Sequence, residues 1–556
     1  MRLSHLSSLV DVALERARVQ GDATFVRYLT TGDVSGPIAT LTYADLARRA
    51  TGIAADLQRR AAVGDRAMLL YPSGIDFVTA FFGCLFAGVI PVPAYPPDLA
   101  KPERGLAKLH AIADDCGARH ALTTSEFLPA LEVVAPPALQ RLATDACNDQ
   151  DVAHWRAPAL SGEDVALLQY TSGSTGAPKG VVVRHRHLLA NQLSVAAGMG
   201  PVDLVVGWLP VFHDMGLGNV MQVLCAGSSL VMMSPFAFLK RPARWLEAIS
   251  HFRATTSGGP NFAYDLCVRR VSEEGRAGLD LASWKVAFCG AEQVRPATFE
   301  RFLAAFEPRG FARTAFYPCY GLAEATLFVT GHKRGTAPTT RAFHAAALER
   351  GAVLEATGDG AAADRSLLMS SGRPSPTEDV RIVDPERRAP TEGVGEIWVR
   401  GPAVASGYWR RYDEAFGARL EDGDGPFLRT GDLGFVHGGE LFVAGRRKEM
   451  MILAGRNLFP QDLEATIEAG VPSIRKGCSA AFSVEVEGDE RLVIMAERES
   501  EGGAPADITR AIRLAVLEHH QAPVHDIVLV EKGAIPKTSS GKLERYACRR
   551  AYATRS

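Results

Sequence analysis

Short apolar runs alternate with helical segments before residue 331. A helix is predicted after the capping-box pair Thr42 and Asp45, because apolar residues then recur at helical spacing. A second helix is predicted at 242–252. The runs that predict buried strands lie at 67–71, 203–210, 229–234 and 284–290. Strands that alternate with helices favour an α/β fold with largely parallel sheets.

The pattern changes after residue 330. Residues 331–366 are rich in Ala, Gly, Thr and charged residues and show little periodicity. Short β runs at 380–385, at 395–402 and on both sides of Gly438-Gly439 then predict a smaller β subdomain. From about residue 446 onward the chain predicts a compact α+β unit, with helices at 460–467 and 507–517, a hairpin turning at Gly488, and a strand at 526–530.

The expected fold class is therefore α/β. It combines a large N-terminal domain of mixed, mostly parallel sheets flanked by helices, including the β subdomain, with a small mobile α+β C-terminal domain. The expected boundaries are 1–445 and 446–556.

Composition and charge exclude several classes of protein. The chain has 61 Lys+Arg against 63 Asp+Glu and a net charge of -2, so it lacks the basic footprint of a nucleic-acid binder. The most apolar run, 77–90, is shorter than the ~20 residues that span a membrane and predicts a buried helix. Nine scattered cysteines without a CxxC pair favour reduced thiols and a cytoplasmic location, and the N-terminus is a poor signal peptide.

The strongest chemical signal is the segment 170–180, YTSGSTGAPKG, which lies between two apolar runs. Its glycines allow tight turns that present backbone N–H groups, and its hydroxyl side chains and one lysine add donors and a positive charge. The candidate ligands are Thr171, Ser172, Gly173, Ser174, Thr175, Gly176 and Lys179. The segment fits neither the Walker A pattern nor the GxSxG pattern, so we expect a polyphosphate loop of another type.

Three further motifs are ambiguous when taken singly. Glu324 in YGLAEAT (320–326) could bind Mg²⁺ or be an ordinary charge at a helix start. Asp432 in RTGDLG (429–434) could accept hydrogen bonds from a ribose diol or be a turn residue. Lys542, which follows Gly541 on a polar loop, could be catalytic or a solvated basic end.

Together, these four motifs resemble the acyl-adenylate-forming superfamily, which includes acyl-CoA synthetases, peptide-synthetase adenylation domains and luciferases. The segment 445–448, GRRK, is similar to the hinge of that superfamily. The stretches 208–217, 257–267 and 455–464 resemble the fatty acyl-AMP ligases more narrowly. Those ligases carry an insertion after the magnesium motif, and the long segment at about 331–371 is similar to it in position.

The resemblance implies ATP-dependent activation of a medium- or long-chain fatty acid to an acyl adenylate, with release of pyrophosphate. The acyl group would then pass to the phosphopantetheine thiol of an acyl carrier protein that acts in trans. The alternatives are a fatty acyl-CoA ligase and an inactive acyl-nucleotide-binding scaffold. If the insertion packs against the C-terminal domain and hinders its rotation, CoA should be a poor acceptor.

The resemblance also implies roles for individual residues. Lys542 and His213 would be catalytic, Lys448 would be the hinge, and Glu324 with Thr171 would bind Mg²⁺. Trp208, Met232 and Phe262 would line the acyl pocket. Besides the loop residues named above, the ATP or AMP ligands would be Gly290, Ala291, Tyr320, Gly321, Asp432 and Arg446.

Overall fold

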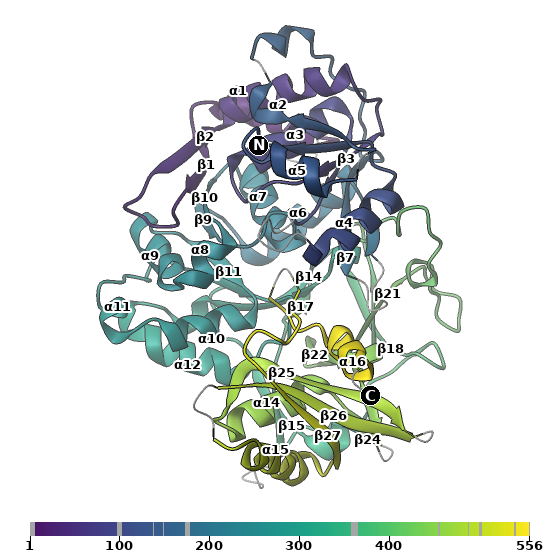
Figure 1. Ribbon diagram of the computed structural model, residues 1–556. Coiled ribbons are helices and arrows are strands. Elements are labelled where there is room, and N and C mark those ends of the chain that lie inside the picture. The colour runs from purple at the N-terminus through teal and green to yellow at the C-terminus, as the bar shows by residue number, and fades with distance from the viewer. Residues whose placement is uncertain are drawn as a thin grey trace.

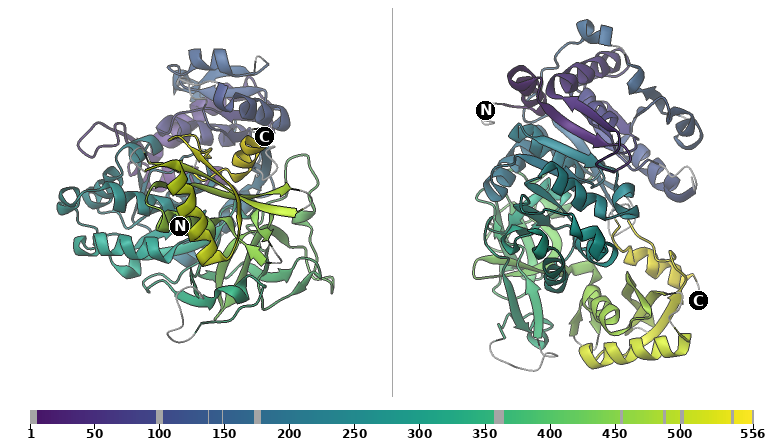
Figure 2. Two further views of the ribbon diagram at one scale, coloured as in Figure 1. Left: turned by 60° about the horizontal axis from the view of Figure 1, so that its bottom comes forward. Right: turned by 90° about the vertical axis from the view of Figure 1, so that its left-hand side faces the viewer.

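The computed structural model has a large N-terminal part and a smaller C-terminal part (Figure 1). Figure 2, right, shows the C-terminal residues, light green to yellow, at the opposite end of the molecule from the N-terminal helices. The structure describes residues 6–96, 103–136, 138–147, 149–172, 178–356, 365–453, 456–486, 489–499, 503–538 and 541–554. No helix within these ranges is long and apolar enough to cross a membrane.

A nine-stranded sheet forms the centre of the N-terminal part. Its six inner strands are parallel, and antiparallel strands close both edges. The strand order is β17 (Arg373–Pro374), β14 (Phe328–Gly331), β13 (Phe316–Gly321), β12 (Val286–Cys289), β11 (Thr256–Gly259), β9 (Leu204–Gly207), β10 (Ser229–Met233), β1 (Thr24–Leu29) and β2 (Ile38–Thr42). The predicted strands at 203–210, 229–234 and 284–290 are confirmed as β9, β10 and β12.

A four-stranded parallel sheet lies beside it, together with an antiparallel hairpin. The sheet order is β4 (Ile90–Pro93), β3 (Arg66–Leu69), β5 (His120–Thr123) and β6 (Gln140–Ala143). The hairpin pairs β7 (Val165–Ser172) with β8 (Pro178–Arg184), so the predicted phosphate loop connects two strands, as expected.

Helices pack against these sheets through their apolar faces. The predicted capping box is present in α2, because the Thr42 hydroxyl accepts from Asp45 N while Asp45 accepts from Thr42 N. The predicted buried helix is α3. The helix bounds are α1 (Leu9–Gln20), α2 (Tyr43–Gln58), α3 (Ile75–Ala87), α4 (Glu103–Cys116), α5 (Leu128–Val134), α6 (His185–Met199), α7 (Asp214–Ala226), α8 (Pro235–Lys240), α9 (Ala243–Phe252), α10 (Asn261–Arg270), α11 (Glu273–Ala277) and α12 (Pro296–Phe306).

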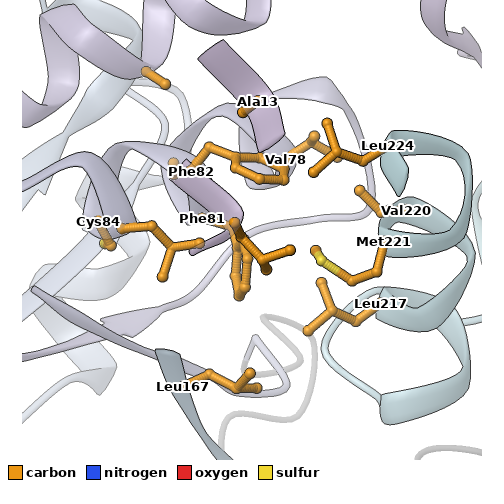
Figure 3. Packing of buried hydrophobic residues seen from close by; sticks show 14 of the residues in the cluster. Ala13, Val78, Phe81, Phe82, Cys84, Leu167, Leu217, Val220, Met221 and Leu224 are labelled. Atoms are coloured by element: carbon orange, nitrogen blue, oxygen red, sulfur yellow. The ribbon is translucent and has the colours of Figure 1, made fainter. Parts of the chain in front are cut away.

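Helix α7 packs one face into the core beside α3 (Figure 3). Leu217, Val220, Met221 and Leu224 recur at the i, i+3, i+4, i+7 spacing of one helix face and point toward Phe81 and its neighbours. The face of α7 that carries Gly218 and Asn219 is left to border a cavity.

The β subdomain is a five-stranded antiparallel sheet, and the segment 331–371 packs on it. The sheet order is β19 (Ala389–Pro390), β18 (Asp379–Asp384), β20 (Gly395–Arg400), β21 (Leu428–His437) and β22 (Glu440–Arg446). The segment forms a hairpin of β15 (Thr340–His344) and β16 (Arg365–Met369) with a short helix α13 (Ala345–Leu348). Phe343 of the hairpin is fully buried against Phe435 and Phe442 of the sheet. The described parts of this segment, 331–356 and 365–371, therefore contain more regular structure than their composition predicts.

The C-terminal part has its own cores, formed by residues from Met451 onward. Both predicted helices and the predicted hairpin and strand are confirmed, although Gly488 of the turn lies outside the described residues. The elements are β23 (Met451–Leu453), β24 (Arg456–Leu458), α14 (Pro460–Gly470), β25 (Ile474–Val486), β26 (Asp489–Arg498), α15 (Pro505–His520), β27 (Val524–Val530) and α16 (Arg545–Ala553).

Candidate active site

A cavity of about 2580 Å³ lies where the N-terminal and C-terminal parts meet. Four parallel strands, β9, β11, β12 and β13, end at one edge of the large sheet, and the residues that follow them form one wall. Most of the predicted site residues line it: Thr171, Lys179, His213, Phe262, Gly290, Ala291, Tyr320, Gly321, Glu324, Asp432, Arg446, Lys448 and Lys542. Gly173, Ser174, Thr175 and Gly176 lie outside the described residues, as does the side chain of Ser172.

The turn after β12 approaches its neighbours so closely that a side chain would not fit. A Cβ at Gly290 would lie 2.9 Å from the Cys319 carbonyl oxygen. Ala291 follows in the left-handed region, with φ of 67°, which non-glycine residues seldom adopt. Gly290 and Ala291 line the cavity, as does Tyr320.

Asp432 joins the β subdomain to the large sheet. Its Oδ2 accepts a 2.8 Å hydrogen bond from Tyr320 Oη, and its Oδ1 lies 3.1 Å from Arg446 Nε. Burial, together with the nearby Asp432 charge, raises the pKa of Tyr320 well above its usual value, so the phenol stays protonated and donates. Asp432 is only 7% exposed and lies within strand β21, so the alternative of a turn residue is wrong.

Glu324 lies in a short 3-10 turn (Ala323–Ala325) rather than at a helix start. Its Oε1 accepts a 2.8 Å hydrogen bond from Tyr408 Oη, and burial raises the pKa of the carboxyl above its usual value despite that bond. Lys179 Nζ sits 4.6 Å from the centre of the Tyr408 ring and forms a 2.9 Å ion pair with Asp413. Lys179 is therefore tied to the loop that carries Tyr408.

Sequence reasoning missed Tyr408, which is 84 residues from its partner Glu324. Residues 406–409 run beside β8, where Val182 N donates to Gly407 O and Trp409 N donates to Gly180 O. This pairing brings Tyr408 to Glu324. The only local sequence feature at this position is the Gly407-Tyr408-Trp409 triplet. The triplet is far from the other motifs in the sequence, so it does not indicate the contact with Glu324.

The residues present fit a magnesium ion that also binds phosphate. Among the described residues, no group of three or more acidic, His or Cys side chains could enclose a metal. Mg²⁺ commonly binds through one or two carboxylates and completes its coordination with substrate phosphates and water. Glu324 and Thr171 both line the cavity and offer oxygen ligands of this kind.

Lys542 reaches the same cavity from the C-terminal part. Burial lowers the pKa of its ammonium, while the carboxylates of Asp214, Glu292 and Asp432 oppose that shift. Burial alone would raise the pKa of Asp214, but His213 and Lys542 hold it below its usual value. Lys542 is therefore a cation held close to acidic side chains from the N-terminal part.

His213 stands at the start of α7, where its Nδ1 lies 2.5 Å from Asp214 Oδ1. It lines the main cavity and a second pocket of about 40 Å³. Gln169 Nε2 donates to Phe212 O at 3.0 Å and so fixes the backbone just before His213. The positioning role of Gln169 was also missed from the sequence, because Gln169 lies in an apolar run.

The predicted acyl-pocket residues are only partly placed as expected. Trp208 and Phe262 line the small second pocket, next to His213 and Lys542. Met232 is 3% exposed, belongs to the core around β10, and lines neither cavity in the described part of the chain, so that prediction is wrong. Its run of apolar residues reflects a buried strand. The main cavity instead has an apolar part of its lining, here called the apolar branch, which is formed by Val195, Met199, Leu327, Phe328, Leu368 and Met369.

The predicted hinge residue, Lys448, lies in a 3-10 turn (Arg447–Glu449) between β22 and β23. The two residues next to Lys448 make ion pairs with different parts of the molecule. Arg447 pairs with Glu386 of the N-terminal part at 2.6 Å, and Glu449 pairs with Arg545 of the C-terminal part at 2.6 Å. The turn is thus the covalent link between the two parts of the molecule.

The segment 331–371 touches the C-terminal part as well as the β subdomain. Glu349, just after α13, accepts two 2.8 Å hydrogen bonds from the Arg456 guanidinium of β24. Asn457 N also donates to Glu349 O at 3.3 Å. A paired Arg–carboxylate fork is among the stronger polar contacts in proteins. The segment is therefore bonded to β24 of the C-terminal part.

The AMP-binding enzyme family matches residues 14–409 of the chain. A second family, described as Disco-interacting protein 2-like, AMP domain, matches residues 448–556.

Among curated relatives, the chain is 41% identical to the medium-chain-fatty-acid–[acyl-carrier-protein] ligase JamA of Moorena producens, over 99% of this chain and 95% of the relative. It is 38% identical to the long-chain-fatty-acid–AMP ligase FadD23 of Mycobacterium tuberculosis, over 94% of this chain and 92% of the relative. Among solved structures, it resembles the Legionella pneumophila fatty acyl-adenylate ligase in complex with acyl adenylate and pyrophosphate. That likeness has a TM-score of 0.77 and 38% identity, over 98% of this chain and 96% of the other.

Proposed function

The chain belongs to the AMP-binding enzyme family, and we propose that it activates a medium- or long-chain fatty acid with ATP and passes the acyl group to an acyl carrier protein. The observation that carries the proposal is that Asp432, Glu324 and Lys542 line one cavity with an apolar branch. That arrangement suits one ligand with a nucleotide at one end and a hydrocarbon chain at the other.

In the first step, a carboxylate oxygen of the fatty acid attacks the α-phosphorus of ATP and pyrophosphate leaves. Negative charge accumulates on the α-phosphoryl oxygens and on the leaving group. Lys542 supplies a fixed positive charge between the carboxylate and the α-phosphate, so the protein accelerates the step by positioning and charge stabilisation. Thr171, Ser172 and the rest of the loop to Gly176 bind the departing phosphates.

Other residues of the cavity lining hold the nucleoside. Asp432 accepts hydrogen bonds from the ribose hydroxyls, and Arg446 fixes the Asp432 carboxylate. Tyr320 stacks on the adenine ring, with Gly290, Ala291 and Gly321 giving the ring close access to backbone. Glu324 and Thr171 would hold Mg²⁺, which supplies charge neutralisation for the phosphates when it is bound.

In the second step, the phosphopantetheine thiol of the carrier protein attacks the acyl carbonyl carbon and AMP leaves, while the thiol proton passes to solvent or a nearby base. Lys542 must withdraw to admit the thiol. We therefore propose that residues 1–445 and 446–556 move as two bodies, with rotation at Lys448. His213, at the mouth of the apolar branch, orients the acyl carbonyl.

The Glu349–Arg456 contact supports a carrier protein over CoA as the acceptor. The segment 331–371 is bonded to β24, so free rotation of the C-terminal part costs those hydrogen bonds. A carrier protein can offset that cost with its own docking contacts, whereas the small CoA molecule has fewer. We place the reaction in the cytoplasm, in keeping with nine cysteines that all have free thiols.

The test incubates the enzyme with ATP, Mg²⁺ and a fatty-acid series, with either CoA or a holo acyl carrier protein. Mass spectrometry should detect acyl adenylate, and then a carrier protein that is heavier by one acyl group. Abundant acyl-CoA with an unmodified carrier protein would favour the CoA-ligase alternative. If no acid releases pyrophosphate, the chain is a nucleotide-binding scaffold.

A further inference from the structure

Three buried amide side chains line the apolar branch of the main cavity. Gln192 comes from α6, and Asn219 and Gln222 come from α7. Their exposed fractions are 5%, 5% and 7%. Within the described residues, the side chains of Gln192 and Asn219 make no hydrogen bond, and Gln222 Nε2 reaches only Met199 Sδ at 3.9 Å.

These amides face the cavity because of how the helix is oriented. The face of α7 that carries Leu217, Val220, Met221 and Leu224 is packed into the core beside Phe81 (Figure 3). Met215, Gly218, Asn219 and Gln222 repeat the same spacing on the cavity side. Asp214 lines the cavity as well, so two of the five α7 residues on its wall are amides.

An amide has two donors and an acceptor with two lone pairs, and burying it without partners costs free energy. A plain hydrocarbon chain beside Asn219 and Gln222 would displace water from both amides, and it has no polar group that could replace the hydrogen bonds to that water. A ligand with its own polar group at that depth would satisfy them.

The depth excludes the reacting carboxyl group as that polar group. His213 occupies the N-cap position of α7 and lines the second pocket together with Lys542, near which the carboxyl must lie. At 1.5 Å of rise per residue, Asn219 is about 9 Å and Gln222 about 13 Å further along the helix axis. The amides therefore meet the body of the acyl chain, several carbons beyond the carboxyl.

We propose that Gln192, Asn219 and Gln222 select fatty acids that carry a hydroxyl or oxo group part-way along the chain. This inference rests on the proposed function and names a substrate class for the same site. The amides are specificity-determining residues that contact the acyl chain, away from the reacting atoms.

The test measures kcat/KM for pyrophosphate release with acids of equal length. One acid is unsubstituted, and the others carry a single hydroxyl or oxo group at successive carbons. A window of mid-chain positions should exceed the unsubstituted acid by about tenfold, which is the scale of one well-placed hydrogen bond. In Asn219→Leu and in Gln222→Met the ratio should fall toward one, through a higher KM for the substituted acid. Ala196→Leu, on an exposed part of α6, should keep the wild-type ratio.

Gln222→Met keeps the side-chain volume, so it serves where Asn219→Leu fails to fold. Adenylate formation that favours the unsubstituted acid at every position would overturn this inference and leave the proposed function standing. An unchanged ratio in Gln222→Met would also overturn it. Absence of adenylate with all acids would overturn the proposed function and this inference together.

Discussion

At the scale of single residues, Asp432 links the side chains that we propose to hold the nucleotide. It accepts from Tyr320 and pairs with Arg446, so three side chains from two sheets share one negative charge. The bond to Tyr320 also orients the ring that is proposed to stack on adenine. A neutral amide in the same place would keep the shape and lose the charge.

Asp432→Asn should therefore raise KM for ATP by about tenfold to a hundredfold, since a hydrogen bond to a charged group is worth about 1.5–3 kcal/mol. Steady-state kinetics with varied ATP measure this change, and KM for the fatty acid should move little. Asp422→Asn, at an exposed position, is the matched control. An unchanged KM for ATP in Asp432→Asn would remove this residue from the ribose site.

Glu378 predicts a pH dependence of stability. It is 7% exposed, and burial raises its pKa from 4.5 to about 7. Between these values the folded state binds more protons than the unfolded state, so stability falls as pH rises from about 4.5 to 7. Above pH 7 the buried charge costs up to about 3 kcal/mol.

Glu378→Gln removes this titration. Relative to wild type, the variant should melt higher at pH 8 and nearly equally at pH 5, as measured by thermal unfolding at both values. Glu392→Gln, which replaces an exposed glutamate, is the control. A difference from wild type that is the same at both pH values would show that Glu378 does not titrate in this range.

The sequence could identify residues whose role shows in a short motif. Glu324, Asp432 and Lys542 were found in this way, and the structure brings all three to one cavity. Tyr408 and Gln169 were missed because their partners are distant in the sequence, and no local pattern marks such contacts. Met232 was misplaced because an apolar residue in a core strand and one in a lipid pocket look alike in sequence.

At the scale of elements, the hairpin and helix within residues 331–371 should control the choice of acceptor. Glu349→Ala removes the paired hydrogen bonds between Glu349 and Arg456. Both of these side chains are only partly exposed. We expect transfer to CoA to rise roughly five- to tenfold, because release of the C-terminal part no longer costs those bonds. Rates of acyl-CoA formation measure the effect.

The paired variant Glu349→Arg with Arg456→Glu is the control for this contact. It rebuilds an ion pair with reversed charges and should return CoA transfer toward the low wild-type rate. Equal CoA transfer in wild type and Glu349→Ala would show that the segment does not restrain the C-terminal part.

Elements with one apolar face or one short apolar run were predictable. The strands of the parallel sheets and helices α2 and α3 follow this rule, because their burial matches their pattern. Helix α6 was not predicted. It buries Asn191 against the sheet and Gln192 against the cavity. Because these buried positions are polar, the apolar residues of α6 do not recur at the spacing that predicts a helix.

At the scale of the whole molecule, the account requires one cavity that serves two reactions in sequence. The N-terminal part supplies the nucleotide wall and the apolar branch, and the C-terminal part supplies Lys542. In the proposed mechanism Lys542 and the incoming thiol need the same space, so the two parts would change their relative position between the steps. The described structure has Lys542 inside the cavity, as the first step requires.

The most direct measurement separates the two half-reactions in Lys542→Ala. Pyrophosphate release from ATP and fatty acid reports the first step, and transfer from added acyl adenylate to the holo carrier protein reports the second. The first step should slow by about a hundredfold to a thousandfold, the cost of removing one preorganised charge, while the second stays close to the wild-type rate. Lys532→Ala, at an exposed position, should change neither step. Equal losses in both steps, or none in the first, would contradict the account.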